Sequence, residues 1–125
     1  MRAVKTEKAP LPVGPYSQAV RAGDFLFISG QVALDPKTKA IGNGGVEAQT
    51  KQTLENVRAI LDAVDLSLEK VVKVTVFLQN IEDFKKMNDV YGAYFRTDPP
   101  ARTTVQAQLP VAGALVEMDV IACFV

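Results

Sequence analysis

Apolar and polar residues alternate along several short stretches of the chain, which is the pattern of β-strands that bury one face. The alternation predicts six strands, at residues 3–5, 17–21, 25–29, 71–78, 102–109 and 115–125. Gly23, between the second and third of these, predicts a hairpin turn. In the fourth strand, Val72, Val74, Val76 and Leu78 are expected to share one face.

Two longer stretches repeat their apolar residues every three or four positions, which predicts amphipathic helices. The first covers residues 46–64, and the second is capped near Asn80 and runs to about Phe95. The apolar stripe of the second helix consists of Phe84, Met87, Tyr91 and Phe95. Asn88 lies beside that stripe, so its amide is expected to be partly buried and to need partners. The alternative is an ordinary place for Asn88 on the exposed helix surface.

The predicted elements follow one another in the order βββαβαββ within a single domain that spans residues 1–125. This order indicates an α+β fold, with one mixed sheet and both helices on one of its faces. The other face would carry Phe25, Phe27 and Ile121, together with a polar surface that includes Arg102 and Glu117. A sheet face this apolar is rarely left in water, so another subunit is the expected cover.

Composition argues against several classes of function. The chain has 125 residues, 48% of them hydrophobic, and its 14 basic and 14 acidic residues cancel, so binding to nucleic acid or a membrane surface is not expected. No stretch reaches the roughly 18 apolar residues of a membrane span, and the N-terminus lacks a signal peptide, so a cytoplasmic protein is expected. Histidine is absent and Cys123 is the only cysteine, which argues against a disulfide or a metal site.

Arg102 and Glu117 are the candidate chemical pair in a chain without histidine. Both residues lie in strand-like stretches, and the sequence predicts that they meet on one surface of the sheet. The planar guanidinium of an arginine matches a carboxylate with two parallel hydrogen bonds. Such a pair would hold a small carboxylic acid and direct a water molecule onto it.

Several short motifs resemble a known family. They are Gly14-Pro15-Tyr16-Ser17-Gln18, Ile28-Ser29-Gly30-Gln31, Asn88-Asp89-Val90-Tyr91, Pro100-Ala101-Arg102-Thr103-Thr104-Val105, and Leu109-Pro110 followed by Val116-Glu117-Met118. In their order and spacing they resemble the signatures of the RidA family, also called the YjgF family. The resemblance extends over essentially the whole chain.

This resemblance implies a chorismate-mutase-like α+β fold, assembled as a homotrimer whose sheets form a central barrel. Three pockets would then lie between neighbouring subunits. Similar proteins hydrolyse reactive enamines and imines, such as 2-aminoacrylate or 2-aminocrotonate, to 2-keto acids and ammonia. The resemblance thus implies a 2-iminobutanoate/2-iminopropanoate deaminase that needs no cofactor.

By position in the motifs, Arg102 would bind the substrate carboxylate and Glu117 would position or activate water. An imine carbon is already electrophilic, so placing the water and moving one proton are sufficient chemistry. The alternative for Arg102 is a surface arginine that pairs with an acidic neighbour. The alternative for Glu117 is a solvated strand residue beside Asp119.

The resemblance implies further substrate-binding residues: Tyr16 as a wall, Ser29 and Gly30 as the floor, Asn88 and Tyr91 at the mouth, and Thr104. Tyr16 and Tyr91 have the alternative of being ordinary packing aromatics. Many relatives have cysteine in place of Thr104, so a role for this position would rest on its hydroxyl or its backbone. The family pattern also differs around Gln108, which stands near a common arginine, so the rim of the pocket and its substrate preference are expected to differ.

Two other functions fit the same sequence. One is a regulatory trimer that binds 2-keto acids without turning them over. The other is an endoribonuclease or translation inhibitor, a description also given to relatives. That activity calls for a basic groove with exposed aromatic residues, and the sequence has no cluster of Lys and Arg.

Overall fold

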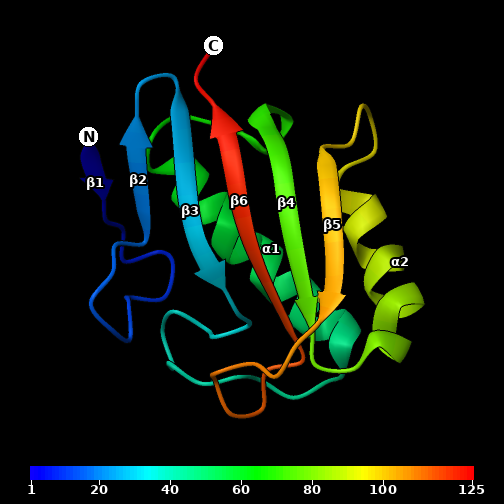
Figure 1. Cartoon of the computed structure of the whole chain (residues 1–125). Coiled ribbons are helices and arrows are strands. Elements are labelled where there is room, and N and C mark those ends of the chain that lie inside the picture. The colour runs from blue at the N-terminus through cyan, green and yellow to red at the C-terminus, as the bar shows by residue number, and fades with distance from the viewer.

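A six-stranded sheet forms the centre of the molecule (Figure 1). The computed structural model describes every residue from Met1 to Val125. The strands are β1 (Arg2–Val4), β2 (Ala19–Ala22), β3 (Phe25–Gln31), β4 (Val71–Leu78), β5 (Ala101–Gln106) and β6 (Val116–Cys123). Their spatial order is β1-β2-β3-β6-β4-β5, and only β4 and β5 run parallel. β5 is therefore an edge strand, while β6 lies inside the sheet.

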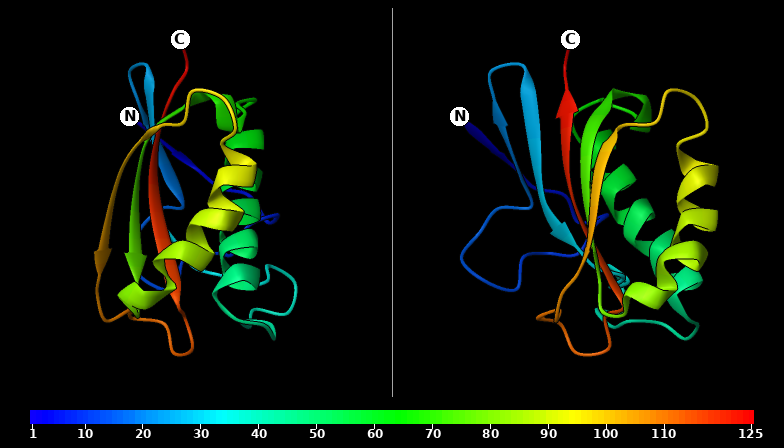
Figure 2. Two further views of the ribbon diagram at one scale, coloured as in Figure 1. Left: turned by 90° about the vertical axis from the view of Figure 1, so that its right-hand side faces the viewer. Right: turned by 45° about the vertical axis from the view of Figure 1, so that its right-hand side comes forward.

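Two helices, α1 (Val46–Asp62) and α2 (Phe84–Tyr94), cover one face of the sheet and leave the other open (Figure 2). Single turns of 3-10 helix, η1 (Leu68–Lys70) and η2 (Ile81–Asp83), precede β4 and α2. A cluster of 21 buried residues fills the space between helices and sheet. The predicted α+β fold, its mixed sheet and the order βββαβαββ are confirmed. None of the helices is both long and apolar enough to cross a membrane.

The crossover from β4 to β5 determines where α2 lies. Parallel neighbouring strands cannot be joined by a tight turn, so the chain must cross over one face of the sheet before it returns. α2 makes this crossing and packs beside the β5 edge (Figure 1). Side chains of β5 that point to the helical face therefore meet α2.

Local signals in the sequence located most elements within a few residues. Gly23 has a φ of +60° in the turn between β2 and β3. The Asn80 side chain accepts a hydrogen bond from the Glu82 amide at 2.9 Å, so it caps η2, and α2 itself begins later, at Phe84, without a side-chain cap. The prediction for Val72 was wrong. The pairing of β4 with β6 skips this residue at a bulge, so Val71 is buried and Val72 is 44% exposed.

The buried amide of Gln18 fixes the loop that follows β1. Its Oε1 accepts from the Thr6 amide at 2.8 Å, and its Nε2 donates to the carbonyls of Thr6 and Pro10 at 2.9 and 2.8 Å. The side chain thus takes the place of a neighbouring strand and satisfies backbone groups that have no sheet partner. This loop leads directly to Tyr16.

Two more buried amides, both on α1, hold loops at the same end of the sheet. Gln49 donates to the Gly113 carbonyl at 2.9 Å and accepts from the Leu115 amide at 2.8 Å. Asn56 donates to the Leu34 carbonyl at 2.9 Å. Buried polar side chains with satisfied hydrogen bonds favour one arrangement of the chain, because any other arrangement leaves them unpaired.

A hydrogen-bonded group of side chains ties α2 to α1. The Tyr94 hydroxyl donates to Glu55 Oε2 at 2.6 Å, and the same carboxylate pairs with Arg58 at 2.9 Å. Burial raises the pKa of Tyr94 to about 12, and the hydrogen bond to Glu55 contributes in the same direction. The hydroxyl therefore remains a donor across the physiological pH range, and the orientation of α2 is supported outside the core.

We expect the substitution Gln18→Leu to lower the free energy of unfolding, because it leaves the Thr6 amide and the Pro10 carbonyl without partners. A buried group left unpaired costs about 1–3 kcal/mol. Urea unfolding at a fixed protein concentration measures the effect. Gln108→Leu, at an exposed glutamine, is the control. Equal stability of the two variants would contradict this role for Gln18.

Candidate functional site

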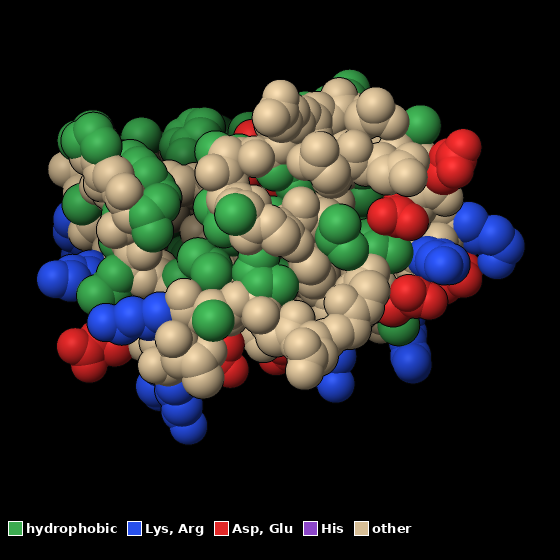
Figure 3. Space-filling model, turned by 90° about the horizontal axis from the view of Figure 1, so that it is seen from below, with side chains coloured by type: hydrophobic (Ala, Val, Ile, Leu, Met, Phe, Trp, Pro, Cys, Tyr) green, Lys and Arg blue, Asp and Glu red, His purple; other side chains and the backbone are tan.

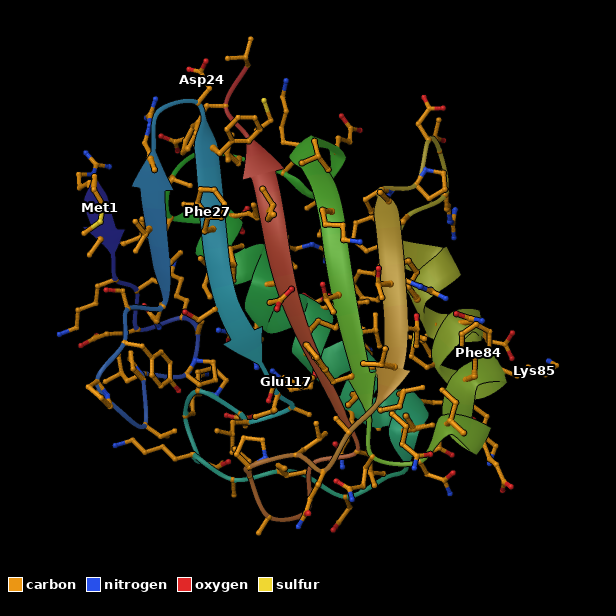
Figure 4. All side chains as sticks on the ribbon, in the orientation of Figure 1. Met1, Asp24, Phe27, Phe84, Lys85 and Glu117 are labelled. Atoms are coloured by element: carbon orange, nitrogen blue, oxygen red, sulfur yellow. The ribbon has the colours of Figure 1, made fainter.

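A cleft of about 710 Å³ lies on the open face of the sheet, between β3, β6 and the loops below them. Its lining includes Tyr16, Ser29, Gly30 and Glu117, which were predicted to belong to one site. Seen from below, hydrophobic side chains gather among these loops (Figure 3). Figure 4 looks onto the open face, where Phe27 and Glu117 lie. The cleft thus combines an apolar lining with two acidic groups, Glu117 and Asp119.

Gly30 provides the space in which the Glu117 carboxylate lies. A side-chain Cβ at position 30 would stand 2.5 Å from Glu117 Oε2 and 3.0 Å from its Cδ. The pairing of β3 with β6 shifts between Ile28 and Gln31, so Ser29 and Gly30 form a bulge. Bulges of this kind redirect side chains and occur often beside active sites.

The Glu117 carboxylate has no partner within the chain, since it takes part in none of the hydrogen bonds or ion pairs of the molecule. Burial raises the pKa of Glu117 above its ordinary value of 4.5, and the charge of Asp119 raises it further. An unpaired carboxylate with a raised pKa holds a proton more readily than an exposed one. Glu117 is therefore suited to take a proton from water and to return it.

Ser29 and Tyr16 both line the cleft, but the Ser29 side chain is held by a hydrogen bond, whereas the Tyr16 ring is exposed. The Ser29 hydroxyl donates to the Ser17 carbonyl at 2.6 Å, so its proton is already engaged in holding the two segments together. Tyr16 is 47% exposed, and its hydroxyl accepts from the Val13 amide at 3.2 Å. Ser29 thus shapes the backbone, while the Tyr16 ring presents an open surface to the cleft.

Arg102 lies on the other side of the sheet. It pairs in register with Val74, which is fully buried under the helices, whereas Glu117 pairs with Phe77 on the open face. Because successive side chains of a strand point to opposite faces, this register separates the two groups. The prediction that Arg102 and Glu117 share one surface of the sheet was wrong for a single chain.

The guanidinium of Arg102 faces α2. Its Cζ lies 4.7 Å from the centre of the Tyr91 ring and 5.5 Å from that of Phe84. Thr104 is partly buried on the same face of β5, opposite Val76. Arg102, Tyr91 and Thr104 therefore belong to one surface at the β5 edge, and Figure 4 places Phe84 on α2 beyond that edge.

Two polar atoms of α2 are buried without a partner: Asn88 Oδ1 and the Tyr91 hydroxyl. The expected partial burial of Asn88 is confirmed, and the expected partners are absent within the chain. Burial raises the pKa of Tyr91, while the charge of Arg102 and the approach of its N–H groups to the hydroxyl act in the opposite direction, although no hydrogen bond of full geometry forms between them. Buried polar atoms without partners are uncommon and mark a place where another group is expected to bind.

The residues predicted for one site thus form two separate groups. Tyr16, Ser29, Gly30 and Glu117 line the cleft on the open face, and Asn88, Tyr91, Arg102 and Thr104 lie between α2 and β5. No three His, Cys, Asp or Glu residues lie close enough to hold a metal ion. Phe84 was not predicted as part of the site, although its spacing to Asn88 and Tyr91, four and seven positions, places all three on one helical face.

The family comparison agrees with the motifs read from the sequence. The family model described as Endoribonuclease L-PSP matches residues 6–124. The chain belongs to this family, which includes the YjgF and RidA proteins. The predicted resemblance is therefore confirmed.

Relatives from distant organisms cover almost the whole chain. A RutC family protein of Pyrococcus horikoshii is 51% identical over 117 residues, which are 94% of this chain and 93% of that protein. The human 2-iminobutanoate/2-iminopropanoate deaminase is 40% identical over 121 residues, 97% of this chain and 88% of the human protein. The family thus contains a protein named for the activity that the motifs predicted.

Solved structures of relatives share the fold closely. RidA from an Antarctic Psychrobacter superposes with a TM-score of 0.93 at 41% identity, covering 98% of this chain and 99% of its own. E. coli TdcF with bound serine superposes with a TM-score of 0.92 at 36% identity, covering 98% of both chains. A related protein therefore binds a small molecule that carries a carboxylate.

We expect Glu117→Gln to raise the melting temperature at pH 7. The folded protein holds the proton of Glu117 more tightly than the unfolded chain does, so ionisation of this carboxyl above its raised pKa disfavours the folded state. The gain should shrink as the pH falls through the raised pKa toward 4.5 and below, because Glu117 is then protonated. Thermal unfolding from pH 3.5 to 8 measures this, with Glu7→Gln in an exposed loop as the control. A gain that stays constant with pH would contradict the assignment.

Proposed function

We propose that this protein is a cytoplasmic homotrimer that hydrolyses reactive 2-imino acids and their enamine tautomers to 2-keto acids and ammonia. It would thus be a 2-iminobutanoate/2-iminopropanoate deaminase. The observation that carries the proposal is the pair of incomplete half-sites, one with a free cation and one with a free carboxylate. The name of the human relative supports this choice of reaction.

A second copy of the chain would complete the site. The open face exposes Phe25 and Phe27 at 44% each and Val105 at 41%, more apolar surface than a sheet normally leaves in water. The Arg102 side of the β5 edge, set against the Glu117 cleft of a neighbour, would enclose one small ligand between them. Such a contact joins two different surfaces, and it forms a closed ring when the rotation from one copy to the next is one third of a turn. Three copies would give three equivalent sites, as the family motifs imply.

Arg102 would bind the substrate carboxylate. It takes part in neither ion pair of the chain, so its charge is free for a ligand, and its fork matches a carboxylate with two hydrogen bonds. Asn88, Tyr91 and Thr104 would surround this end of the substrate. The unpartnered Asn88 Oδ1 and Tyr91 hydroxyl would gain partners in the closed site.

Glu117 of the neighbouring copy would direct the water. An enamine first takes a proton from solvent at carbon 3 and becomes the iminium ion, which is the protonated imine. Water then adds to carbon 2 while Glu117 accepts one of its protons, which gives a neutral tetrahedral amino alcohol. Glu117 returns that proton to the nitrogen, the carbon–nitrogen bond breaks as the hydroxyl group releases its proton to solvent, and ammonia and the 2-keto acid leave. No bond to the protein forms, and the raised pKa of Glu117 suits both proton transfers.

The residues around Glu117 would define the reaction space. Gly30 lets the carboxylate lie against the backbone, and Ser29 fixes that backbone through Ser17. The exposed Tyr16 ring would cover the bound substrate and exclude bulk water. A water held between Glu117 and a fixed imine carbon would react as part of a preassembled complex.

A complementation experiment tests both the pair and its position between subunits. We expect Arg102→Ala to lower kcat/KM by about 100-fold through loss of the charged hydrogen bonds, and Glu117→Gln by about 10²–10⁴-fold. When the two inactive variants are unfolded, mixed equally and refolded, about a quarter of the interfaces of a cyclic trimer would pair an intact Arg102 with an intact Glu117. Activity should therefore return to about a quarter of the wild-type value. A mixture that stays inactive would exclude a shared site.

The assay distinguishes the proposed reaction from its alternatives. A serine or threonine dehydratase supplies 2-aminoacrylate, semicarbazide traps it, and the protein should divert it to pyruvate. A wild-type protein that binds 2-keto acids without this effect would be a regulatory trimer. Cleavage of RNA that survives Arg102→Ala and Glu117→Gln would point to a separate ribonuclease activity.

We expect Gly30→Ala to reduce kcat strongly while the fold is retained. The added methyl group would stand 2.5 Å from Glu117 Oε2, so the carboxylate must turn away, which a flexible side chain does at small cost to stability. Gly42→Ala is the matched control, because a Cβ there meets nothing within 4 Å. Steady-state kinetics and thermal unfolding measure the two effects. Full activity in Gly30→Ala would remove Glu117 from the mechanism.

A further inference from the structure

Arg102 contacts two aromatic rings but no acidic side chain. Its guanidinium carbon lies 4.7 Å from the Tyr91 ring centre and 5.5 Å from the Phe84 ring centre. Phe84 and Tyr91 are seven positions apart on α2, two helical turns, so their side chains form one continuous surface beside β5. Tyr91 is 5% exposed, whereas Phe84 is 41% exposed.

Arg58 shows what a structural arginine looks like in the same molecule. It also lies over an aromatic ring, 5.2 Å from the centre of Tyr94, but it is paired with the Glu55 carboxylate at 2.9 Å. An aromatic face attracts a guanidinium without neutralising its charge, whereas a carboxylate neutralises it and occupies its N–H groups. The difference is that Arg102 has the ring contacts and lacks the anion.

We infer that Phe84 and Tyr91 form an aromatic platform that orients the Arg102 guanidinium and takes the place of a protein counter-ion. This inference rests on the proposed function and adds Phe84 to the residues that determine it. The two rings limit the rotation of the long Arg102 side chain before the ligand binds. Less conformational entropy is then lost on binding. The N–H groups of the fork stay available for the substrate carboxylate.

The unpartnered polar atoms of α2 fit this arrangement. Asn88 lies between Phe84 and Tyr91 on the same helical face, and its Oδ1 is buried without a partner, as is the Tyr91 hydroxyl. A guanidinium carries five N–H donors, and a bound carboxylate uses only two of them. The remaining donors can satisfy these oxygens once the ligand has fixed the plane of the fork. Phe84, Asn88 and Tyr91 are thus positioning residues that act through Arg102.

Phe84→Leu tests the platform, because it keeps an apolar side chain of similar length at a partly exposed position and removes only the ring. A cation–π contact at an exposed site corresponds to about a two- to fivefold change in affinity. We expect KM for the imine, and the dissociation constant of 2-oxobutanoate measured by calorimetry, to rise by that factor while kcat stays within about twofold. Phe124→Leu, which removes the ring beneath Arg21 instead, is the matched control and should change neither constant.

A spectroscopic measurement makes the test independent of turnover. The Nε–Hε signal of Arg102 should carry a ring-current shift in the wild-type protein, assigned by its loss in Arg102→Ala, and Phe84→Leu should reduce it. If that signal and the 2-oxobutanoate affinity are both unchanged in Phe84→Leu, the platform is excluded. A changed signal with unchanged affinity also overturns it, because the ring would then hold the side chain without serving the ligand. If Arg102→Ala binds 2-oxobutanoate as tightly as wild type, Arg102 does not bind the substrate carboxylate, and that part of the proposed function is wrong. The Nε–Hε signal of Arg102 in Phe84→Leu then shows by itself whether the rings order this side chain.

Discussion

The alternation of side chains along neighbouring strands is the constraint on which the rest of the site depends. Arg102 is in register with Val74, and Glu117 with Phe77, so β4 carries their partners on opposite faces. Rotation of the side chains cannot bring Arg102 and Glu117 together, because the sheet and the core residues packed on it, such as Val76 and Leu78, lie between them. A single chain therefore carries two separate groups of candidate residues. If the two groups act on one substrate, association of chains is a condition of activity.

Both proposed half-sites contain features that do not favour stability. Glu117 is an unpaired carboxylate beside Asp119, and α2 leaves two polar atoms without partners. Free energy must come from elsewhere in the fold to compensate, as is usual at functional sites. The buried amides of Gln18, Gln49 and Asn56 contribute here, because each satisfies loop backbone groups near the cleft. The loops around Glu117 are thus fixed by contacts that do not involve Glu117 itself.

The sequence was sufficient to predict the helices and strands, but not to predict which side chains of different strands lie on the same face of the sheet. Periodicity located both helices, and the Gly23 and Asn80 signals located a turn and a cap, because each depends on interactions within a few residues. The bulge that turns Val72 outward and the register that separates Arg102 from Glu117 depend on pairing with β6 and β4, which are distant in sequence. The motifs predicted the candidate site residues as one set. They carried no information on which members share a face or belong to one copy.

The positions of Arg102 and Glu117 explain how a free cation and a free carboxylate could meet at the proposed interface without neutralising each other. Two opposite charges brought together in a cleft of low polarity would pair strongly and exclude the substrate. In this protein each group is held by neighbouring elements of its own chain: the Glu117 carboxylate lies in the space above Gly30, and the Arg102 guanidinium lies over the rings of α2. In the proposed assembly these restraints would keep the two charges apart by the length of one small molecule. A substrate with a carboxylate at one end and an imine carbon beside it would then bridge a gap that the protein cannot close alone.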